Sequence, residues 1–210
     1  IKSDYIIEVD ITPNRSDACS HYGVARDLYA WLVRNEYKTS LHRPATDAFH
    51  VDDNTMSIDI EILEKEACPR YCAVGLTGCE VKESPEWLQK KLTSIGVRPI
   101  NNIVDVTNYI MFAFGQPLHC FDADMIEGNK VIVKTMEEGS PFVTLDGVEH
   151  KLSSKDLAIC NENGAMCIAG VFGGQGSGTY ATTKNVLIES AYFNPTWIRK
   201  SARRHGLSTD

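Results

Sequence analysis

The chain has 210 residues, a formal net charge of −7, 43% hydrophobic residues and 23% charged residues. This is the composition of a globular protein with one large or two small domains, and its acidic balance argues against a general nucleic-acid coat. No apolar run reaches the roughly 18 residues of a membrane span and no signal-peptide pattern is present, so no membrane is expected as a partner.

The cysteines indicate a reducing compartment. Their number, seven, is odd, and Cys68, Cys72 and Cys79 lack the spacing of a zinc knuckle. Reduced and mostly buried thiols are therefore expected, in a cytoplasmic protein without a metal site. The chain begins with Ile1 and ends at Asp210, which suggests a fragment of a longer protein.

The first residues predict a strand followed by a helix. Apolar and acidic residues alternate over 5–11, as they do in a half-buried strand. Ser16 or Asp17 is expected to cap the helix that follows, whose apolar face ends near Leu32.

The His-, Pro- and Asp-rich residues 41–54 have no hydrophobic period, which is typical of a linker. We therefore expect residues 1–45 to be a strand-helix piece of a neighbouring domain together with linker. Residues 46–210 are expected to form the main domain.

The main domain begins with strands that are predicted over 56–62 and 71–81. Ser84 followed by Pro85 is the pattern of an N-cap with proline at the first helical position. The helix that starts there is expected to end at Gly96.

A longer helix is predicted within 98–124, because apolar residues recur at helical spacing and Gly115 supplies a stop. Asn101, Asp105 and Asn108 share another face of this helix. These side chains lower helix propensity, and they suit either a polar ligand or capping and a buried network.

After this helix the pattern changes to short strands and hairpins, and a final helix ends before Gly206. Asp146-Gly147 is the strongest hairpin signal. Strands are expected over 130–136, 142–145, 157–160, 166–171 and 186–193. This order predicts an α+β fold, an unusual β-sandwich or mixed sheet with flanking helices.

Glu189 is the most unusual single residue, because in the strand 186–193 it shares a face with apolar side chains. Burying a carboxylate without a partner is costly or raises its pKa. We therefore expect Glu189 to have a binding function, and the alternative is a structural ion pair, for instance with Arg98.

Three further features leave alternatives open. The glycines of 170–178 match no nucleotide-binding motif but allow close approach of backbone to a ligand. His119 lies in an apolar segment, where a lone histidine is more often a core residue than a catalyst. The last helix has basic side chains that suit phosphate contacts or a solvated cationic face, and these are Arg199, Lys200, Arg203 and Arg204.

Five strings of the sequence together resemble one family: VDITPNRSDACSHYGVARDLYA, PINNIVDVTNYIMFAFGQPLHCFDAD, IAGVFGG, NVLIESAYF and ARRHGLSTD. They are similar, in family order and over nearly the whole chain, to the β chain of bacterial-type phenylalanyl-tRNA synthetase. The resemblance implies its editing module, which hydrolyses tyrosine wrongly esterified to the phenylalanine tRNA. The fold it implies is an unusual β-sandwich with helices.

The resemblance also implies roles for individual residues. Glu189 matches the residue that recognises the tyrosine hydroxyl. The other residues implied for the pocket are His119, Asn108 and Thr107 for catalysis and Arg98, Gly173 and Thr209 for substrate binding. The basic residues of the last helix are candidates for binding tRNA.

The implied partners are the acceptor end of tRNA(Phe), tyrosine as the editing ligand, and the α subunit in an α2β2 assembly. No cofactor is implied for this fragment, whereas ATP and Mg²⁺ belong to the whole synthetase. The alternative function is a non-catalytic tRNA-binding or α-subunit scaffold module of the same synthetase.

Overall fold

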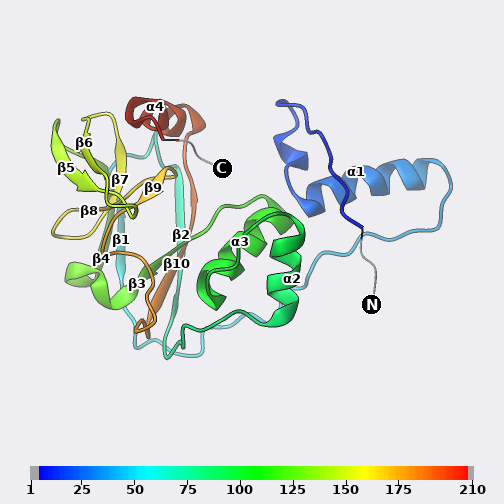
Figure 1. The fold of residues 1–210 in the computed structure, drawn as a ribbon, viewed down its shortest axis with the longest axis horizontal. Helices are drawn as coiled ribbons and strands as arrows, with labels where there is room; N and C mark the ends of the chain where they lie inside the picture. Colours follow the sequence, from blue (N-terminus) through cyan, green and yellow to red (C-terminus); the bar gives the residue numbers. More distant parts are fainter. Residues whose placement is uncertain (1–4, 208–210) are drawn as a thin grey trace. The chain divides into compact units, whose positions relative to one another are not determined.

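The computed structural model describes residues 5–207 and divides the chain into two compact units (Figure 1). The first unit consists of Ile1–Asp52 and Lys82–Leu118, and the second consists of Asp53–Val81 and His119–Asp210. Within the part of the chain that the structure describes, no helix combines the length and the apolar character needed to cross a membrane.

The two units do not follow the boundary expected after residue 45, because 82–118 belongs to the first unit. The division into a neighbouring-domain piece and a main domain over 46–210 stays a prediction. Residues 41–54 contain no helix or strand, which confirms the irregular structure expected there.

The first unit is built from helices. Leu88 and Leu92 are buried, each 1% exposed. The rings of Tyr22 and Phe114 lie 6.1 Å apart between the first and third α-helices. The elements are the 3-10 turn Ser16–Ala18, α1 (His21–Arg34), α2 (Glu86–Ser94) and α3 (Asn102–Phe114).

The beginning of the chain differs from the prediction in two ways. Residues 5–11 form no strand, because no described strand offers their backbone a hydrogen-bonded partner. The cap of α1 is Ser20, whose hydroxyl accepts the backbone N–H of Gly23 at 2.9 Å. The predicted caps, Ser16 and Asp17, lie instead in the preceding 3-10 turn.

The polar stripe of α3 is largely structural. Asn101 is the N-cap, and its side chain accepts two N–H groups of the first helical turn. The buried carboxylate of Asp105 accepts the Ser84 hydroxyl at 2.5 Å and the Ile100 N–H at 2.8 Å. Ser84, predicted to cap α2, therefore bonds to α3, and Pro85 occupies the N-cap position of α2.

The described residues of the second unit form three sheets (Figure 1). The first has the order β1-β4-β7-β8-β9, with β1 and β4 parallel and the other pairs antiparallel. The second is antiparallel with the order β2-β10-β3, and the third is the hairpin β5-β6. The strands are β1 (Asp59–Ile62), β2 (Arg70–Leu76), β3 (His119–Asp122), β4 (Lys130–Thr135), β5 (Ser140–Val143), β6 (Glu149–Leu152), β7 (Leu157–Cys160), β8 (Ala165–Ile168), β9 (Phe172–Gly173) and β10 (Val186–Tyr192).

The connections in this unit follow the local sequence. Gly147 has φ 82° in the predicted turn between β5 and β6, a conformation that glycine adopts readily. Two 3-10 turns, Ala123–Met125 and Glu127–Asn129, lie between β3 and β4. Helix α4 (Pro195–His205) follows β10 and ends at Gly206.

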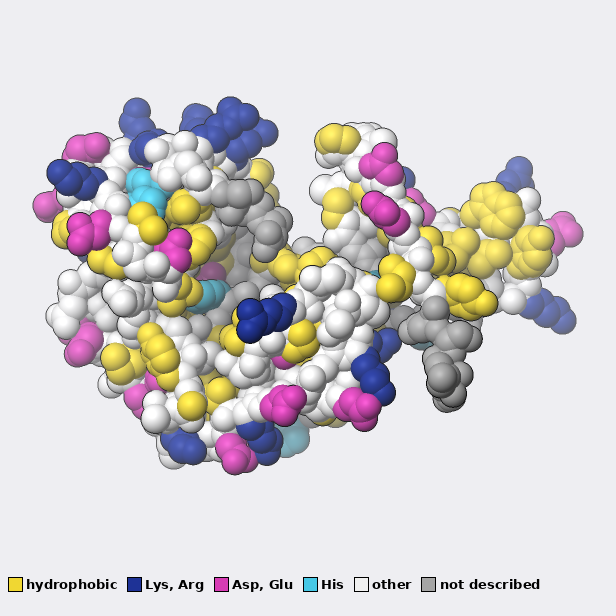
Figure 2. All heavy atoms as spheres, viewed as in Figure 1, with side chains coloured by type: hydrophobic (Ala, Val, Ile, Leu, Met, Phe, Trp, Pro, Cys, Tyr) yellow, Lys and Arg dark blue, Asp and Glu magenta, His cyan; other side chains and the backbone are white. Residues whose placement is uncertain are grey.

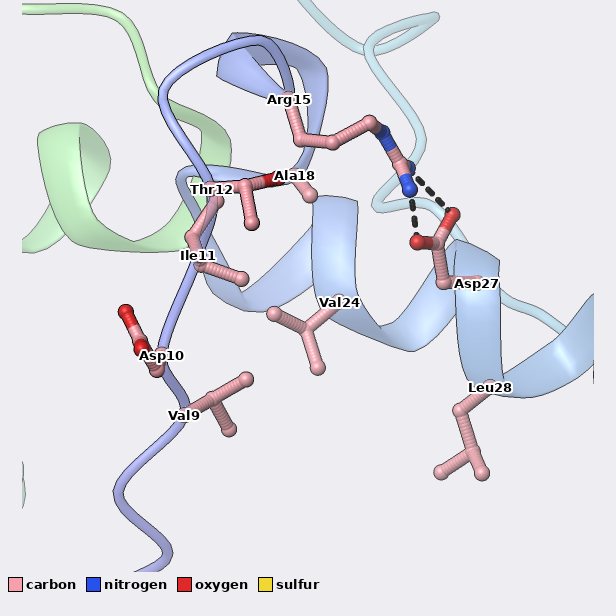
Figure 3. A pocket seen from close by; sticks show the side chains of 9 residues that line it. All are labelled: Val9, Asp10, Ile11, Thr12, Arg15, Ala18, Val24, Asp27 and Leu28. Atoms are coloured by element: carbon pink, nitrogen blue, oxygen red, sulfur yellow. Dashed lines mark hydrogen bonds and ion pairs between the residues drawn. The ribbon is translucent and has the colours of Figure 1, made fainter.

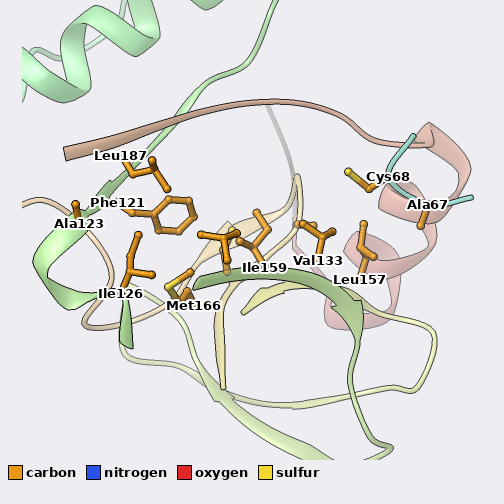
Figure 4. Packing of buried hydrophobic residues seen from close by; sticks show 13 residues of the cluster. Ala67, Cys68, Phe121, Ala123, Ile126, Val133, Leu157, Ile159, Met166 and Leu187 are labelled. Carbon is orange, nitrogen blue, oxygen red and sulfur yellow. The ribbon is translucent and has the colours of Figure 1, made fainter. Parts of the chain in front are cut away.

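One hydrophobic core joins the two larger sheets (Figure 4). Phe121 and Leu187 come from the three-stranded sheet, while Val133 and Ile159 come from the five-stranded sheet. All four side chains are at most 3% exposed, so the sheets bury their apolar faces against each other. This arrangement confirms the α+β class with packed mixed sheets.

All seven cysteines are unpaired, which agrees with the expected free thiols. Four of them are buried in the second unit, namely Cys68, Cys120, Cys160 and Cys167. Burial raises the pKa of the Cys68 and Cys160 thiols to about 11, which keeps them protonated and unreactive at neutral pH.

Candidate functional site

The candidate site is built on β10, the central strand of the three-stranded sheet. Glu189 lies opposite His119 of β3 on one side and opposite Ala73 of β2 on the other. Directly opposed residues in antiparallel strands project from the same sheet face. The fold thus makes Glu189 and His119 neighbours, although they are 70 residues apart in the sequence.

Glu189 is buried, with 5% of its surface exposed. Its Oε2 accepts a hydrogen bond from the Tyr71 hydroxyl at 2.9 Å. Burial raises the pKa of Glu189 to about 7, and the Tyr71 hydrogen bond opposes that rise. The hydrogen-bond partner of this buried carboxyl group is a neutral donor instead of a cation.

His119 contributes a buried polar atom without a partner. Its Nε2 has no hydrogen bond among residues 5–207, while its ring packs edge-on against Phe121 at 4.6 Å. Burial lowers the pKa of His119 to about 4, so the imidazole is neutral at physiological pH. Buried polar atoms are nearly always satisfied, and an unsatisfied one suits a bound ligand or water.

Gly173 brings backbone close to the imidazole. A Cβ at this position would lie 3.3 Å from His119 Cε1 and 2.8 Å from Leu145 Cδ1. A larger residue would thus have to displace the Leu145 side chain and press on His119. The structure therefore brings Gly173, His119 and Glu189 together in the second unit, while their functional roles stay predictions.

Three other predicted residues belong to the first unit. Arg98 is exposed, Asn108 is half-buried, and Thr107 is buried. The Thr107 hydroxyl donates to the carbonyl of Val104 at 2.7 Å, so its proton is already engaged. Their functional roles stay predictions, and Thr209 lies outside the described residues.

The basic residues of α4 fall into two groups. Arg199, Lys200 and Arg203 are exposed, and Figure 2 shows Lys and Arg side chains gathered over this helix. Arg204 instead forms an ion pair with Asp156. The first three side chains are exposed to solvent, whereas Arg204 has a structural partner.

Asp156 is fully buried and fastens α4 to the sheets. Besides Arg204, it accepts His205 Nε2 at 2.6 Å and the Ser153 N–H at 2.8 Å. Burial raises the pKa of this carboxyl, but hydrogen bonds from Ser153, Ser201 and His205 outweigh it, and the net pKa is lowered.

Sequence patterns did not single out Tyr71 or Asp156. Tyr71 has the inward phase of an alternating strand, which is the one signal that could have drawn attention to it. Its partner, Glu189, is 118 residues away in sequence, so only the strand pairing reveals the contact.

A separate hollow of about 290 Å³ lies in the first unit, between residues 9–12 and α1 (Figure 3). Arg15 lines it and forms ion pairs with Asp17 and Asp27, so its charge is compensated locally. None of the predicted site residues lines this hollow. We therefore assign the candidate site to the sheet face with Glu189.

Glu189 and His119, the buried titratable groups of the candidate site, predict opposite effects of pH on the free energy of unfolding. The contribution of Glu189 to the free energy of unfolding is fully present below its usual pKa of 4.5 and is lost as the pH rises through about 7. The contribution of His119 to the free energy of unfolding is fully present above its usual pKa of 6.5 and is lost as the pH falls through about 4. Between pH 4.5 and 6.5, the free energy of unfolding therefore falls with rising pH because of Glu189 and rises with rising pH because of His119.

Glu189→Gln should remove the pH dependence of the free energy of unfolding that Glu189 causes. The free energy of unfolding of the variant should then rise, relative to the unchanged chain, as the pH rises from 4.5 to 7. Urea denaturation at a series of pH values measures this difference. Parallel curves for the two proteins would contradict the assigned burial of Glu189.

Comparison with known proteins identifies a domain family and several similar relatives. The B3/4 domain family matches residues 67–210. The chain is 66% identical over 210 residues to the phenylalanine–tRNA ligase beta subunit of Bacteroides thetaiotaomicron. It is 54% identical over 211 residues to that of Porphyromonas gingivalis, and each match covers 100% of this chain and 26% of the relative.

The chain thus spans about a quarter of the length of the curated relatives it matches. A crystal structure of an N-terminal fragment of the phenylalanyl-tRNA synthetase beta subunit from Pyrococcus horikoshii has a similar fold. The likeness covers 88% of this chain and 55% of that chain, with a TM-score of 0.51 and 16% identity. The matched residues include both Glu189 and His119, and the chain belongs to the B3/4 domain family.

Proposed function

We propose that this chain is the proofreading part of a phenylalanine–tRNA ligase beta subunit and hydrolyses the ester of tyrosyl-tRNA(Phe). The observation on which this rests is the buried Glu189 carboxylate beside His119, whose Nε2 has no hydrogen-bond partner among residues 5–207. The names of the similar relatives support the choice of synthetase.

A carboxylate on an apolar face suits the discrimination that such proofreading needs. An apolar synthetase pocket rejects an added hydroxyl only about 10²-fold. A site that bonds the hydroxyl rejects the analogue without it by about 10⁴-fold or more, because its polar groups are left unpaired. Glu189 would accept a hydrogen bond from the phenolic hydroxyl of tyrosine, whereas phenylalanine would leave the carboxylate without that bond.

The proposed reaction is attack of water on the aminoacyl ester. The water oxygen bonds to the carbonyl carbon, the ester bond to the ribose oxygen breaks, and the proton of the water passes to that ribose oxygen. His119, which is neutral, would position the water or substrate through Nε2. Asn108 and the backbone near Gly173 would stabilise the oxyanion, and Thr107 would accept a hydrogen bond from the water.

The whole protein to which this chain would belong would act in the cytoplasm on the acceptor end of tRNA(Phe), with an α subunit in an α2β2 assembly. Arg199, Lys200 and Arg203 would contact phosphate groups, and Arg98 and Thr209 would contact the substrate. ATP and Mg²⁺ would serve aminoacylation elsewhere in the synthetase, whereas ester hydrolysis consumes only water.

The test is deacylation of tyrosyl-tRNA(Phe) and phenylalanyl-tRNA(Phe) by the full-length protein with its partner subunit. We expect the tyrosyl ester to be hydrolysed faster by about 10⁴-fold in kcat/KM. Equal rates for the two esters would reject the proposal. Binding of both tRNAs without hydrolysis of either would favour the non-catalytic scaffold function.

A further inference from the structure

We propose that Tyr71 is a specificity-determining positioning residue, which holds Oε2 of Glu189 so that Oε1 is the oxygen that receives the substrate hydroxyl. The inference rests on the proposed function and extends it to a residue on another strand. Tyr71 would act through Glu189 and would not touch the reacting ester.

The strand pairing fixes this contact. Tyr71 lies opposite Ala191, and Ala73 lies opposite Glu189, so Tyr71 is the diagonal neighbour of Glu189 on the same face. The hydroxyl reaches Oε2 at 2.9 Å, an ordinary length for a strong hydrogen bond. Paired residues continue along β2 and β10 on both sides of this point, which limits the movement of either backbone.

The contact leaves one carboxylate oxygen for a ligand. Oε1 of Glu189 has no hydrogen-bond partner among residues 5–207, whereas Oε2 is occupied by Tyr71. A phenol has one O–H donor, so one oriented acceptor matches it. Fixing the carboxylate before the ligand arrives also reduces the entropy that binding must cost.

The charges around Glu189 give Tyr71 a second effect. The groups that face or interact with the carboxylate are Tyr71, His119, Cys68, Cys120 and Cys167. Burial keeps the pKa of each thiol raised and that of His119 lowered, so none of these groups provides a positive charge at neutral pH. The Tyr71 hydrogen bond is the interaction that lowers the pKa of Glu189 against its burial.

Tyr71 also remains a donor over the physiological range. Burial and the adjacent Glu189 raise the pKa of its hydroxyl above the ordinary tyrosine value. Removal of this hydroxyl should therefore free the carboxylate to rotate and favour its protonated form. Both changes weaken the acceptor that the substrate hydroxyl needs.

Tyr71→Phe tests this role because it deletes one hydroxyl and keeps the ring. In the full-length protein with its partner subunit, the ratio of kcat/KM for tyrosyl over phenylalanyl ester should fall about tenfold. The midpoint of the tyrosyl kcat/KM profile should move to higher pH. Tyr192→Phe, on the exposed end of β10, is the matched control and should change neither quantity.

A double-mutant cycle separates positioning from packing. In a Glu189→Ala background, Tyr71→Phe should have no further effect on the ratio. Replacing Tyr71 with 3,5-difluorotyrosine, a stronger donor, should move the pH midpoint in the opposite direction, to lower pH. This second variant keeps the ring in place should Tyr71→Phe fold poorly.

The outcomes separate this inference from the proposed function. A wild-type protein that prefers the tyrosyl ester, with Tyr71→Phe at the same ratio and midpoint, would overturn the role of Tyr71 alone. An equal loss in the Glu189→Ala background would also overturn it, because the effect would not pass through Glu189. A wild-type protein with no preference would reject the proposed function and this role with it.

Discussion

Replacing Glu189 with Ala should reduce the preference for a tyrosyl over a phenylalanyl ester from about 10⁴-fold to about tenfold or less. The preference requires a buried acceptor that phenylalanine leaves unpaired, and Ala removes that acceptor. The tyrosyl ester should lose rate while the phenylalanyl ester gains, because the site no longer penalises the missing hydroxyl. Single-turnover deacylation of both esters by the full-length protein measures the ratio.

Two variants make this result specific. Glu189→Gln keeps the shape and a neutral acceptor, so its preference should lie between those of the natural protein and Glu189→Ala. Glu149→Gln, on the exposed outer position of β6, makes the same chemical change without touching the site. A Glu189→Ala protein that is folded and retains the full preference would remove Glu189 from substrate recognition.

The position of Glu189 could be predicted from sequence because it depends on one local regularity. A strand of period two puts Leu187 and Glu189 on one face, and β10 has that phase, with both side chains buried. The neighbours of Glu189 depend on register between strands, and register is set by the assembled sheet. His119 and Tyr71 could therefore be placed beside it only by the structure, or in the case of His119 by resemblance.

For the polar residues of α3, the sequence predicted the shared face but not the hydrogen-bond partners. Asn101, Asp105 and Asn108 share a face by spacing, but spacing does not reveal which polar groups need them. The side chain of Asn101 accepts hydrogen bonds from the otherwise unpaired N–H groups at the start of the helix. The carboxylate of Asp105 accepts hydrogen bonds from Ser84 and Ile100. Of the three, Asn108 is the residue without a structural task of this kind among the described contacts.

The strand expected over 5–11 failed for a physical reason of another kind. Its alternation is real, yet a strand is stable only when a second strand pairs with it and a core covers its apolar face. Within residues 5–207 neither is present for this segment, and side chains such as Tyr5 and Ile7 are at least 80% exposed. Local pattern can thus predict that a segment is suited to a sheet but not that a sheet is available.

Asp156 supports the second large prediction, which concerns stability. Asp156→Asn should lower the free energy of unfolding by about 3 kcal/mol and the melting temperature by about 10 °C. The carboxylate is fully buried and accepts Arg204, His205 and Ser153, and an amide can satisfy only part of this set. Arg204 is partly exposed and can turn to water, which places the loss at the lower end for a buried pair.

The pH dependence of the same variant distinguishes a lost charge from a lost shape. The pKa of Asp156 is lowered, so its contribution to stability exists above the usual aspartate pKa and is lost as the pH falls below it. The stability deficit of Asp156→Asn should therefore shrink on acidification, while the exposed Asp59→Asn control should show little deficit at any pH. Thermal unfolding across that range measures both, and a deficit that is constant with pH would mean that Asp156 stabilises α4 by packing instead of by its charge.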